Sequence, residues 1–235
     1  MEERYIRYYS HHLGRDNEML TYGHWGHPVI IFPTTMGRFH EAKDFRLIES
    51  VYWHLTNGVA KVYCPDSIDK DSWYAKHLHP SVRILNHNLY DRFLAEELVP
   101  FIQKECNVEK VAVAGCSFGG FHAANFAFRH PELVSHVFAM GAAFDIRSFM
   151  DGYYDDNVYF NNPPDYLPNA TNPALWQMKC IKLGTAEHDF CKSDNYRMSG
   201  ILSRKNILHD LDDRPFGNHD WPIWREMFPA YLSSL

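Results

Sequence analysis

The chain has 235 residues, 46% of them hydrophobic, so it can bury the core of one sizeable domain. Its net charge of −6 argues against a general nucleic-acid-binding protein, which would carry a basic patch. No stretch approaches 18 apolar residues and the N-terminus has no apolar signal segment, so we expect neither a membrane span nor a secretory signal.

Cysteine and histidine usage restricts the expected chemistry further. The five cysteines are odd in number and form no C-x-x-C pair, which favours a reducing compartment such as the cytoplasm over a disulfide framework. The fifteen histidines include no H-E-x-x-H motif, and no Cys/His set has zinc-finger spacing. We therefore expect a cytoplasmic protein without a metal site.

Strand and helix patterns alternate along the chain. Two edge-like strands open it, with a hairpin turn expected over 14–17. The predicted strands are 4–10, 18–22, 28–32, 60–64, 111–114, 134–140, 180–183 and 207–209. The predicted helices are 41–55, 88–106 with a kink or break at Pro100, 120–129, 194–203 and 220–235. This alternation predicts a single α/β domain over 1–235, with a mostly parallel central sheet covered by helices on both faces.

Residues 144–177 interrupt the alternation. The segment is rich in Asp, Asn, Pro and Tyr, and structureless loops of this length are uncommon unless they are functional. We predict a short lid or an elaborated loop over the site. The candidates for the walls of a substrate pocket are Tyr153, Tyr154 and Tyr159 from this segment, and Trp73 from the loop over 66–74.

The sequence over 115–119 reads G-x-S-x-G and carries the strongest functional signal. An apolar strand precedes it and a helix follows, which is the context that raises a serine hydroxyl above the end of a sheet. The alternative is a glycine-rich turn with an incidental serine. The flanking elements favour Ser117 as a nucleophile, and Cys116, at the variable position of the motif, is interpreted as packing.

A serine needs a base to accept its proton, and the base needs an acid to orient it. In α/β-hydrolases these partners follow the serine in the order acid, then histidine, each in a loop after a strand. Asp189, after the strand over 180–183, is the preferred acid, with Glu187 as the alternative. His219, directly before the last helix, is the predicted base.

The oxyanion that forms during acyl transfer needs two preorganised N–H donors. The first is predicted to be the backbone amide of Phe118, directly after the nucleophile. The second should come from the turn after the strand over 28–32, where Met36 is preferred and Thr35 is the alternative.

These motifs resemble the serine esterase family that includes S-formylglutathione hydrolase and the bacterial mycolyltransferases. The matching segments are 115–120, 184–189 and 217–221 followed by Trp224, and the likeness is looser in the first half. The resemblance implies an α/β-hydrolase fold and a carboxylic ester hydrolase without a cofactor, with Ser117, Asp189 and His219 as nucleophile, acid and base. The turn over 33–36, Pro-Thr-Thr-Met, departs from the glycine-containing turn frequent in relatives.

The predicted function is hydrolysis of small acyl esters or thioesters through an acyl-serine intermediate. Short acyl groups are expected because 235 residues leave little room for a large cap. An acyltransferase with the same triad and a non-catalytic binding protein on a hydrolase scaffold are the alternatives. The expected partner is a small-molecule ester, and association into homo-oligomers stays open.

Overall fold

One eight-stranded sheet organises the chain, all 235 residues of which are described by the computed structural model. The strand order is β1-β2-β4-β3-β5-β6-β7-β8. β2 pairs antiparallel with β1 and β4, and all other neighbours are parallel, which confirms the predicted mostly parallel sheet. The strands are Glu3–Ser10 (β1), Arg15–Tyr22 (β2), His27–Phe32 (β3), Ala60–Pro65 (β4), Val111–Cys116 (β5), Val134–Met140 (β6), Cys180–His188 (β7) and Asp210–Asn218 (β8).

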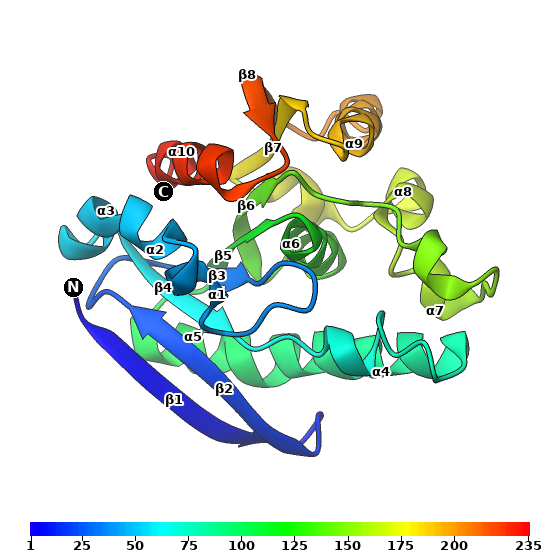
Figure 1. Cartoon of the computed structure of the whole chain (residues 1–235), viewed down its shortest axis with the longest axis horizontal. Helices are drawn as coiled ribbons and strands as arrows, with labels where there is room; N and C mark the ends of the chain where they lie inside the picture. Colours follow the sequence, from blue (N-terminus) through cyan, green and yellow to red (C-terminus); the bar gives the residue numbers. More distant parts are fainter.

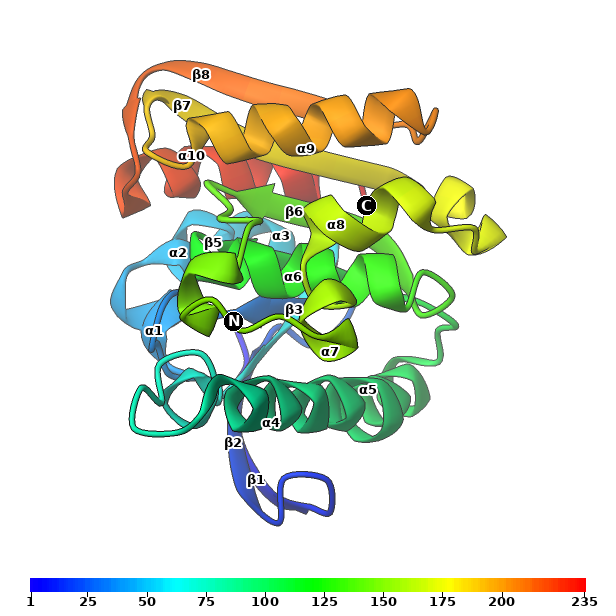
Figure 2. The ribbon, with the colours of Figure 1, turned by 90° about the vertical axis from the view of Figure 1, so that its right-hand side faces the viewer.

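Helices cover both faces of this sheet (Figures 1 and 2). The apolar residues of α2, α3 and α10 pack on one face, and those of α4, α5, α6 and α9 pack on the other. No helix combines the length and apolarity needed to cross a membrane. The helices are Glu41–Asp44 (α1), Leu47–Ser50 (α2), Tyr52–Thr56 (α3), Pro80–Phe93 (α4), Val99–Cys106 (α5), Phe118–Arg129 (α6), Asp156–Tyr159 (α7), Pro163–Tyr166 (α8), Lys192–Arg204 (α9) and Trp221–Leu232 (α10).

The parallel strands bring their carboxyl ends to one edge of the sheet. Because β3, β5, β7 and β8 run in the same direction, the loops that follow them gather there. These loops hold all the predicted catalytic and oxyanion residues. This edge faces the viewer in Figure 1.

Two predicted helices differ in the structure. The helix expected over 41–55 is split into α1, α2 and α3. Arg46, left-handed with φ of 62°, separates α1 from α2, and Val51, with φ of −108° and ψ of 17°, separates α2 from α3. The helix expected over 88–106 begins earlier, at Pro80, whose missing N–H is tolerated in a first turn. A π-helical turn over Leu94–Leu98 joins α4 to α5 directly before Pro100, and this wider turn accommodates the proline.

Two predicted strand boundaries were also wrong. The opening hairpin turns over residues 11–14 rather than 14–17, and β2 begins at Arg15. The last strand is not 207–209 but β8, Asp210–Asn218. β8 lies at the edge of the sheet and most of its residues are partly or fully exposed, so it carries no apolar run for a sequence pattern to detect.

Residues 144–177 fold into short helical turns, including α7 and α8, rather than an extended loop. The segment is tied to the body of the protein: Phe144 donates its backbone N–H to Asp194 of α9, and Arg83 of α4 donates to the Phe149 carbonyl oxygen. Its action as a lid stays a prediction.

Candidate active site

Ser117 lies at the sharp turn between β5 and α6. Its φ of 54° and ψ of −122° are strained for a residue with a side chain. Two glycines allow the surrounding backbone to approach closely. A Cβ on Gly115 would lie 2.1 Å from the Gly119 carbonyl oxygen, and one on Gly119 would lie 2.4 Å from the Phe32 carbonyl oxygen. The turn is therefore the sterically crowded elbow that the G-x-S-x-G motif predicts.

The structure brings Ser117, His219 and Asp189 into one hydrogen-bonded chain. The Nε2 atom of His219 lies 2.8 Å from the Ser117 Oγ, and its Nδ1 lies 2.7 Å from the Asp189 Oδ1. Since the carboxylate can only accept from Nδ1, Nε2 is left to accept the serine proton. The segments that follow three different strands, β5, β7 and β8, thus bring the candidate nucleophile, acid and base within hydrogen-bond distance.

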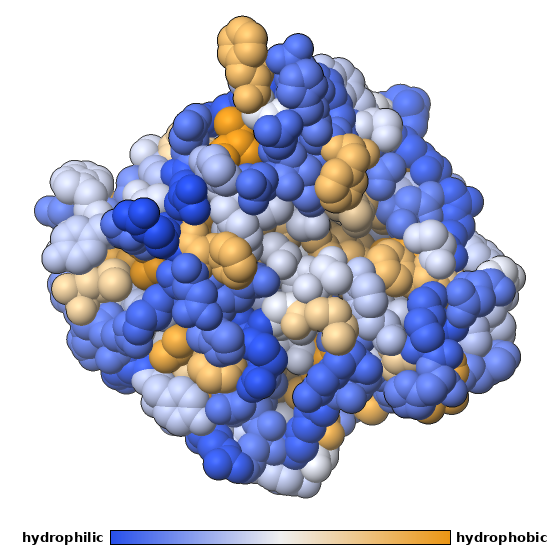
Figure 3. All heavy atoms as spheres, viewed as in Figure 1, coloured by the Kyte–Doolittle hydropathy of each residue, from blue (hydrophilic) through white to orange (hydrophobic).

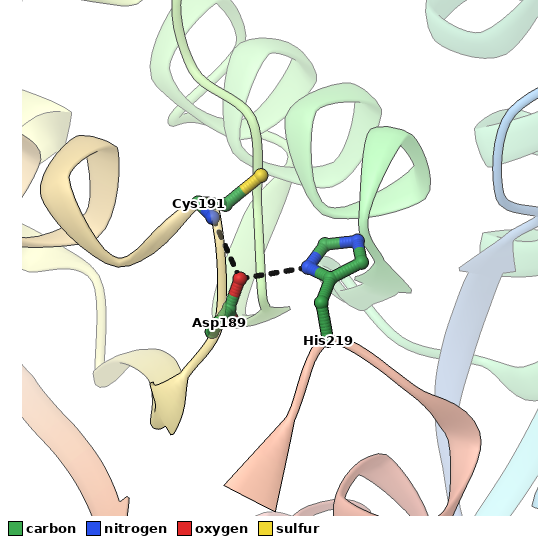
Figure 4. A group of neighbouring side chains, drawn as sticks. All are labelled: Asp189, Cys191 and His219. Atoms are coloured by element: carbon green, nitrogen blue, oxygen red, sulfur yellow. Dashed lines mark hydrogen bonds and ion pairs between the residues drawn. The ribbon is translucent and has the colours of Figure 1, made fainter.

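Asp189 is held in place by its own loop. Its Oδ1 accepts the Cys191 backbone N–H at 2.7 Å (Figure 4). Its Oδ2 accepts the Thr185 hydroxyl at 3.2 Å. Its carboxylate is buried, so it faces the imidazole without competition from solvent. Glu187, the alternative acid, is exposed and instead accepts the Phe216 backbone N–H.

Asp189, Cys191 and His219 also offer three potential metal-ligating atoms within 4.8 Å of one another. Burial and the neighbouring Asp189 raise the pKa of the Cys191 thiol to about 12, which disfavours the thiolate that a metal requires. The Asp189 carboxylate already accepts from His219 and from the Cys191 amide. The group is therefore better suited to orienting His219 than to binding a metal ion.

The turn after β3 offers a different amide from the one preferred at first. Met36 donates its N–H to the Asp69 carboxylate at 3.3 Å, and Thr34 donates to Glu41 at 2.7 Å. Gly37 donates to the Thr34 carbonyl oxygen, whereas the N–H of Thr35 has no acceptor within the chain. Met36 is engaged because Asp69 reaches it from the loop after β4. The backbone N–H of Thr35, the alternative residue, is therefore the N–H of this turn that remains available to an oxyanion.

Phe118 supplies the other predicted donor position. It is the first residue of α6, so its N–H has no acceptor within the helix. The positive end of the helix dipole also favours negative charge at this point. Of the residues predicted as donors, Phe118 and Thr35 are thus the two whose amides have no acceptor within the chain.

Trp73 does not line an accessible pocket. Its side chain has no exposed surface and packs against His87, Phe118 and Phe121, at ring distances of 4.6, 6.2 and 5.6 Å. The next residue, Tyr74, faces the turn over 33–37, named here the oxyanion turn, and its hydroxyl donates to the Thr35 Oγ1 at 3.3 Å. The adjacent aromatic residues Trp73 and Tyr74 were the sequence signal for a residue near the site, but only the packing shows that Trp73 is the buried one.

The tyrosines of the 144–177 segment neither hydrogen-bond nor stack with the triad. Tyr153 donates to Asp155, Tyr154 donates to Asp165, and Tyr159 accepts from Asn169. Those three contacts lie within the segment itself. Their predicted role as walls of a substrate pocket therefore stays a prediction, because no contact links them to Ser117, Asp189 or His219.

Two aromatic residues contact His219: Phe190, to which the sequence assigned no role, and Trp224, which entered only through the family resemblance. The Phe190 ring lies 3.9 Å from the His219 ring, centroid to centroid, and 77% of Phe190 is exposed. Trp224 meets the imidazole edge-on at 5.0 Å. Phe190 could have been found only from its position directly after Asp189 in the sequence. Around this region, apolar and weakly polar residues occupy the middle of the face and hydrophilic residues its periphery (Figure 3).

The Esterase family model matches residues 66–235, well over half of the chain. The chain belongs to the Esterase family. This membership confirms the predicted carboxylesterase-type hydrolase and the family resemblance, including the α/β-hydrolase fold. The matched region contains Ser117, Asp189 and His219 and begins after the oxyanion turn. A search of curated protein sequences returned no match to this esterase.

Solved structures share the fold of this esterase at low sequence identity. A ferulic acid esterase is 15% identical with a TM-score of 0.78, covering 99% of this chain and 97% of that one. S-formylglutathione hydrolase from Staphylococcus aureus is 16% identical with a TM-score of 0.75, covering 99% and 98%. MPT51 from Mycobacterium tuberculosis is 14% identical with a TM-score of 0.69, covering 99% and 97%. At these identities the likeness establishes the fold and not the substrate.

Proposed function

We propose that this esterase hydrolyses small acyl esters or thioesters through an acyl-serine intermediate on Ser117. The observation that carries the proposal is the continuous hydrogen-bonded chain from Ser117 through His219 to Asp189, with distances of 2.8 and 2.7 Å. A serine hydroxyl becomes nucleophilic when such a base removes its proton in the transition state.

The geometry supports a two-step reaction. As the Ser117 Oγ attacks the acyl carbon, its proton passes to the His219 Nε2, and Asp189 stabilises the resulting imidazolium. The carbonyl oxygen gains negative charge and accepts from the amides of Phe118 and Thr35. The tetrahedral species then expels the alcohol or thiol, which takes the proton from His219. A water molecule, deprotonated by the same base, releases the acid and restores Ser117.

Two features support a compact acyl group. Phe118 belongs to an aromatic cluster in which Trp73 and Phe121 are fully buried, so packed rings rather than open space lie behind Phe118. Tyr74 and Phe149 pack together at 5.3 Å and continue the same wall. Among structural neighbours, a ferulic acid esterase and an S-formylglutathione hydrolase indicate that this fold serves both esters and thioesters.

A fluorophosphonate probe and a series of p-nitrophenyl esters test the proposal. The probe should label Ser117, identified by peptide mass spectrometry, and labelling should disappear in Ser117→Ala. Each methylene that fits a pocket contributes about 0.8 kcal/mol, while overpacking reverses the gain, so kcat/KM should peak at acyl chains of roughly two to four carbons. Activity still rising at about eight carbons would exclude the small-acyl proposal. Added alcohols separate hydrolysis from acyl transfer, since a hydrolase releases mainly the free acid.

A further inference from the structure

The oxyanion turn contains a strained residue that needs support. Met36 has a φ of 59°, a left-handed conformation that costs a residue with a side chain of order 1 kcal/mol or more. Such conformations persist only where surrounding contacts hold them. Here the N–H of Met36 donates to Asp69, at 3.3 Å, from a loop that lies 33 residues further along the chain.

Asp69 is in turn bound to the helix that follows the nucleophile. Its Oδ1 accepts from the Nε2 of His122 at 2.9 Å, while its Oδ2 takes the Met36 amide. Asp69 has no exposed surface and His122 is 3% exposed. His122 lies on α6, and its ring packs on Phe118 at 5.0 Å. One buried pair therefore contacts both segments that offer an oxyanion donor.

Stability alone does not account for this pair. Burying a carboxylate is costly, and a buried ion pair is often no more stabilising than apolar residues of the same volume. Neither Asp69 nor His122 hydrogen-bonds Ser117, Asp189 or His219. What the pair does achieve is a fixed connection between the turn after β3 and the first turns of α6.

We propose that Asp69 and His122 are positioning residues that hold the amides of Thr35 and Phe118 in register for the oxyanion. The proposal rests on the proposed function. When the Asp69 carboxylate is lost, Met36 can relax towards negative φ, and the direction of the neighbouring Thr35 N–H changes. The oxyanion develops only in the transition state, so the loss falls on kcat rather than on KM.

Three variants test the pair with p-nitrophenyl acetate as substrate. Asp69→Ala removes the acceptor for both donors. His122→Phe keeps the ring volume and removes the donor, whereas His122→Gln keeps an N–H near the position of Nε2. Removing one oxyanion donor outright costs about 100- to 1,000-fold in kcat, so misdirecting one should cost at least roughly 10-fold, with KM changed less than about threefold. His122→Gln should recover most of the kcat lost in His122→Phe.

A second histidine–aspartate pair provides a matched control. His130, directly after α6, contacts Asp91 of α4 at the same distance of 2.9 Å, far along the helix from the oxyanion turn. His130→Phe should lower Tm without lowering kcat. A merely structural role for Asp69 and His122 would give the same pattern as His130→Phe, and it would make His122→Gln and His122→Phe equal in kcat. Either result overturns the proposal.

The outcomes also separate the two proposals. Wild-type protein that neither turns over p-nitrophenyl acetate nor labels at Ser117 would remove the proposed function and this inference together. Active wild-type protein with an unchanged kcat in Asp69→Ala would remove this inference alone. If Asp69→Ala does not fold, the comparison of His122→Gln with His122→Phe decides, because it leaves the carboxylate in place.

Discussion

The turn at Ser117 and the turn over 33–37, which carry the candidate oxyanion amides, are stabilised in different ways. The turn at Ser117 is set by backbone packing, since Gly115 and Gly119 allow carbonyl oxygens to approach where a Cβ would collide. The turn over 33–37 is held by side chains from elsewhere: Glu41 binds Thr34, and Asp69 binds Met36. A turn determined by its own glycines can be recognised from a short motif, whereas a turn held by distant carboxylates cannot.

The largest expected effect tests the turn at Ser117. Ser117→Ala should reduce kcat by about a million-fold, because the remaining residues of a triad contribute little without the nucleophile. Circular dichroism and Tm should stay close to those of the wild type, since the hydroxyl supports no other contact than His219. Ordinary ester turnover by the folded variant would disprove the assignment of the nucleophile.

The next largest effect concerns Asp189, the proposed acid that orients His219. Asp189→Asn should reduce kcat by about 10,000-fold, because an amide facing Nδ1 stabilises the wrong histidine tautomer. Glu187→Gln is the matched control, since Glu187 lies two residues away and binds only the Phe216 amide among backbone groups. Steady-state kinetics on p-nitrophenyl acetate compare the two, and a larger loss in Glu187→Gln would reverse the assignment of the acid.

The backbone origin of the Ser117 turn predicts a loss of stability. Gly115→Ala places a Cβ 2.1 Å from the Gly119 carbonyl oxygen, so the free energy of unfolding should fall by about 3 kcal/mol or more. Gly200→Ala in α9 is the control, because its Cβ would meet only the flexible Arg204 side chain at 3.4 Å. That change should stabilise the protein by about 0.5–1 kcal/mol, as alanine favours a helix. Urea unfolding measures both, and equal effects would contradict the steric explanation.

The side-chain origin of the oxyanion turn predicts a smaller effect. Glu41→Ala leaves the Thr34 amide and hydroxyl without their acceptor, and because Thr34 is only partly buried this costs about 0.5–1.5 kcal/mol. Part of this cost should be visible as a reduction of kcat by roughly 10-fold as the turn loosens. Glu49→Ala on α2, which removes only an exposed ion pair with Arg46, should change neither kcat nor Tm noticeably. Equal kcat values for the two variants would show that Glu41 does not hold the turn.

The smallest effect concerns Met36 itself. Met36→Gly removes the strain of a side chain at a φ of 59° but adds flexibility to the unfolded chain. The two terms nearly cancel, so the free energy of unfolding should change by less than about 1 kcal/mol and kcat by less than roughly threefold. A large loss of activity would mean that the Met36 side chain itself, which is half exposed, contacts the substrate.

The sequence by itself determined the alternation of strands and helices, the elbow at Ser117, and the order of Ser117, Asp189 and His219 after successive strands. These features depend on local patterns: apolar runs in doubly covered strands, glycines that permit close approach, and polar residues placed directly after strands. Asp189 and His219 could be chosen because both end up at the same edge of a parallel sheet.

Only the tertiary structure decided the remaining features, because each depends on contacts between distant segments. Asp69, 33 residues after Met36, accepts the Met36 N–H, so the amide of Thr35 and not that of Met36 is left without an acceptor. Packing against α6 buried Trp73 and left Tyr74 facing the site. The edge strand β8 is largely exposed to solvent and therefore lacks an apolar pattern, so the sequence did not reveal its position. Where a side chain's role is set by a partner many residues away, no local pattern records it.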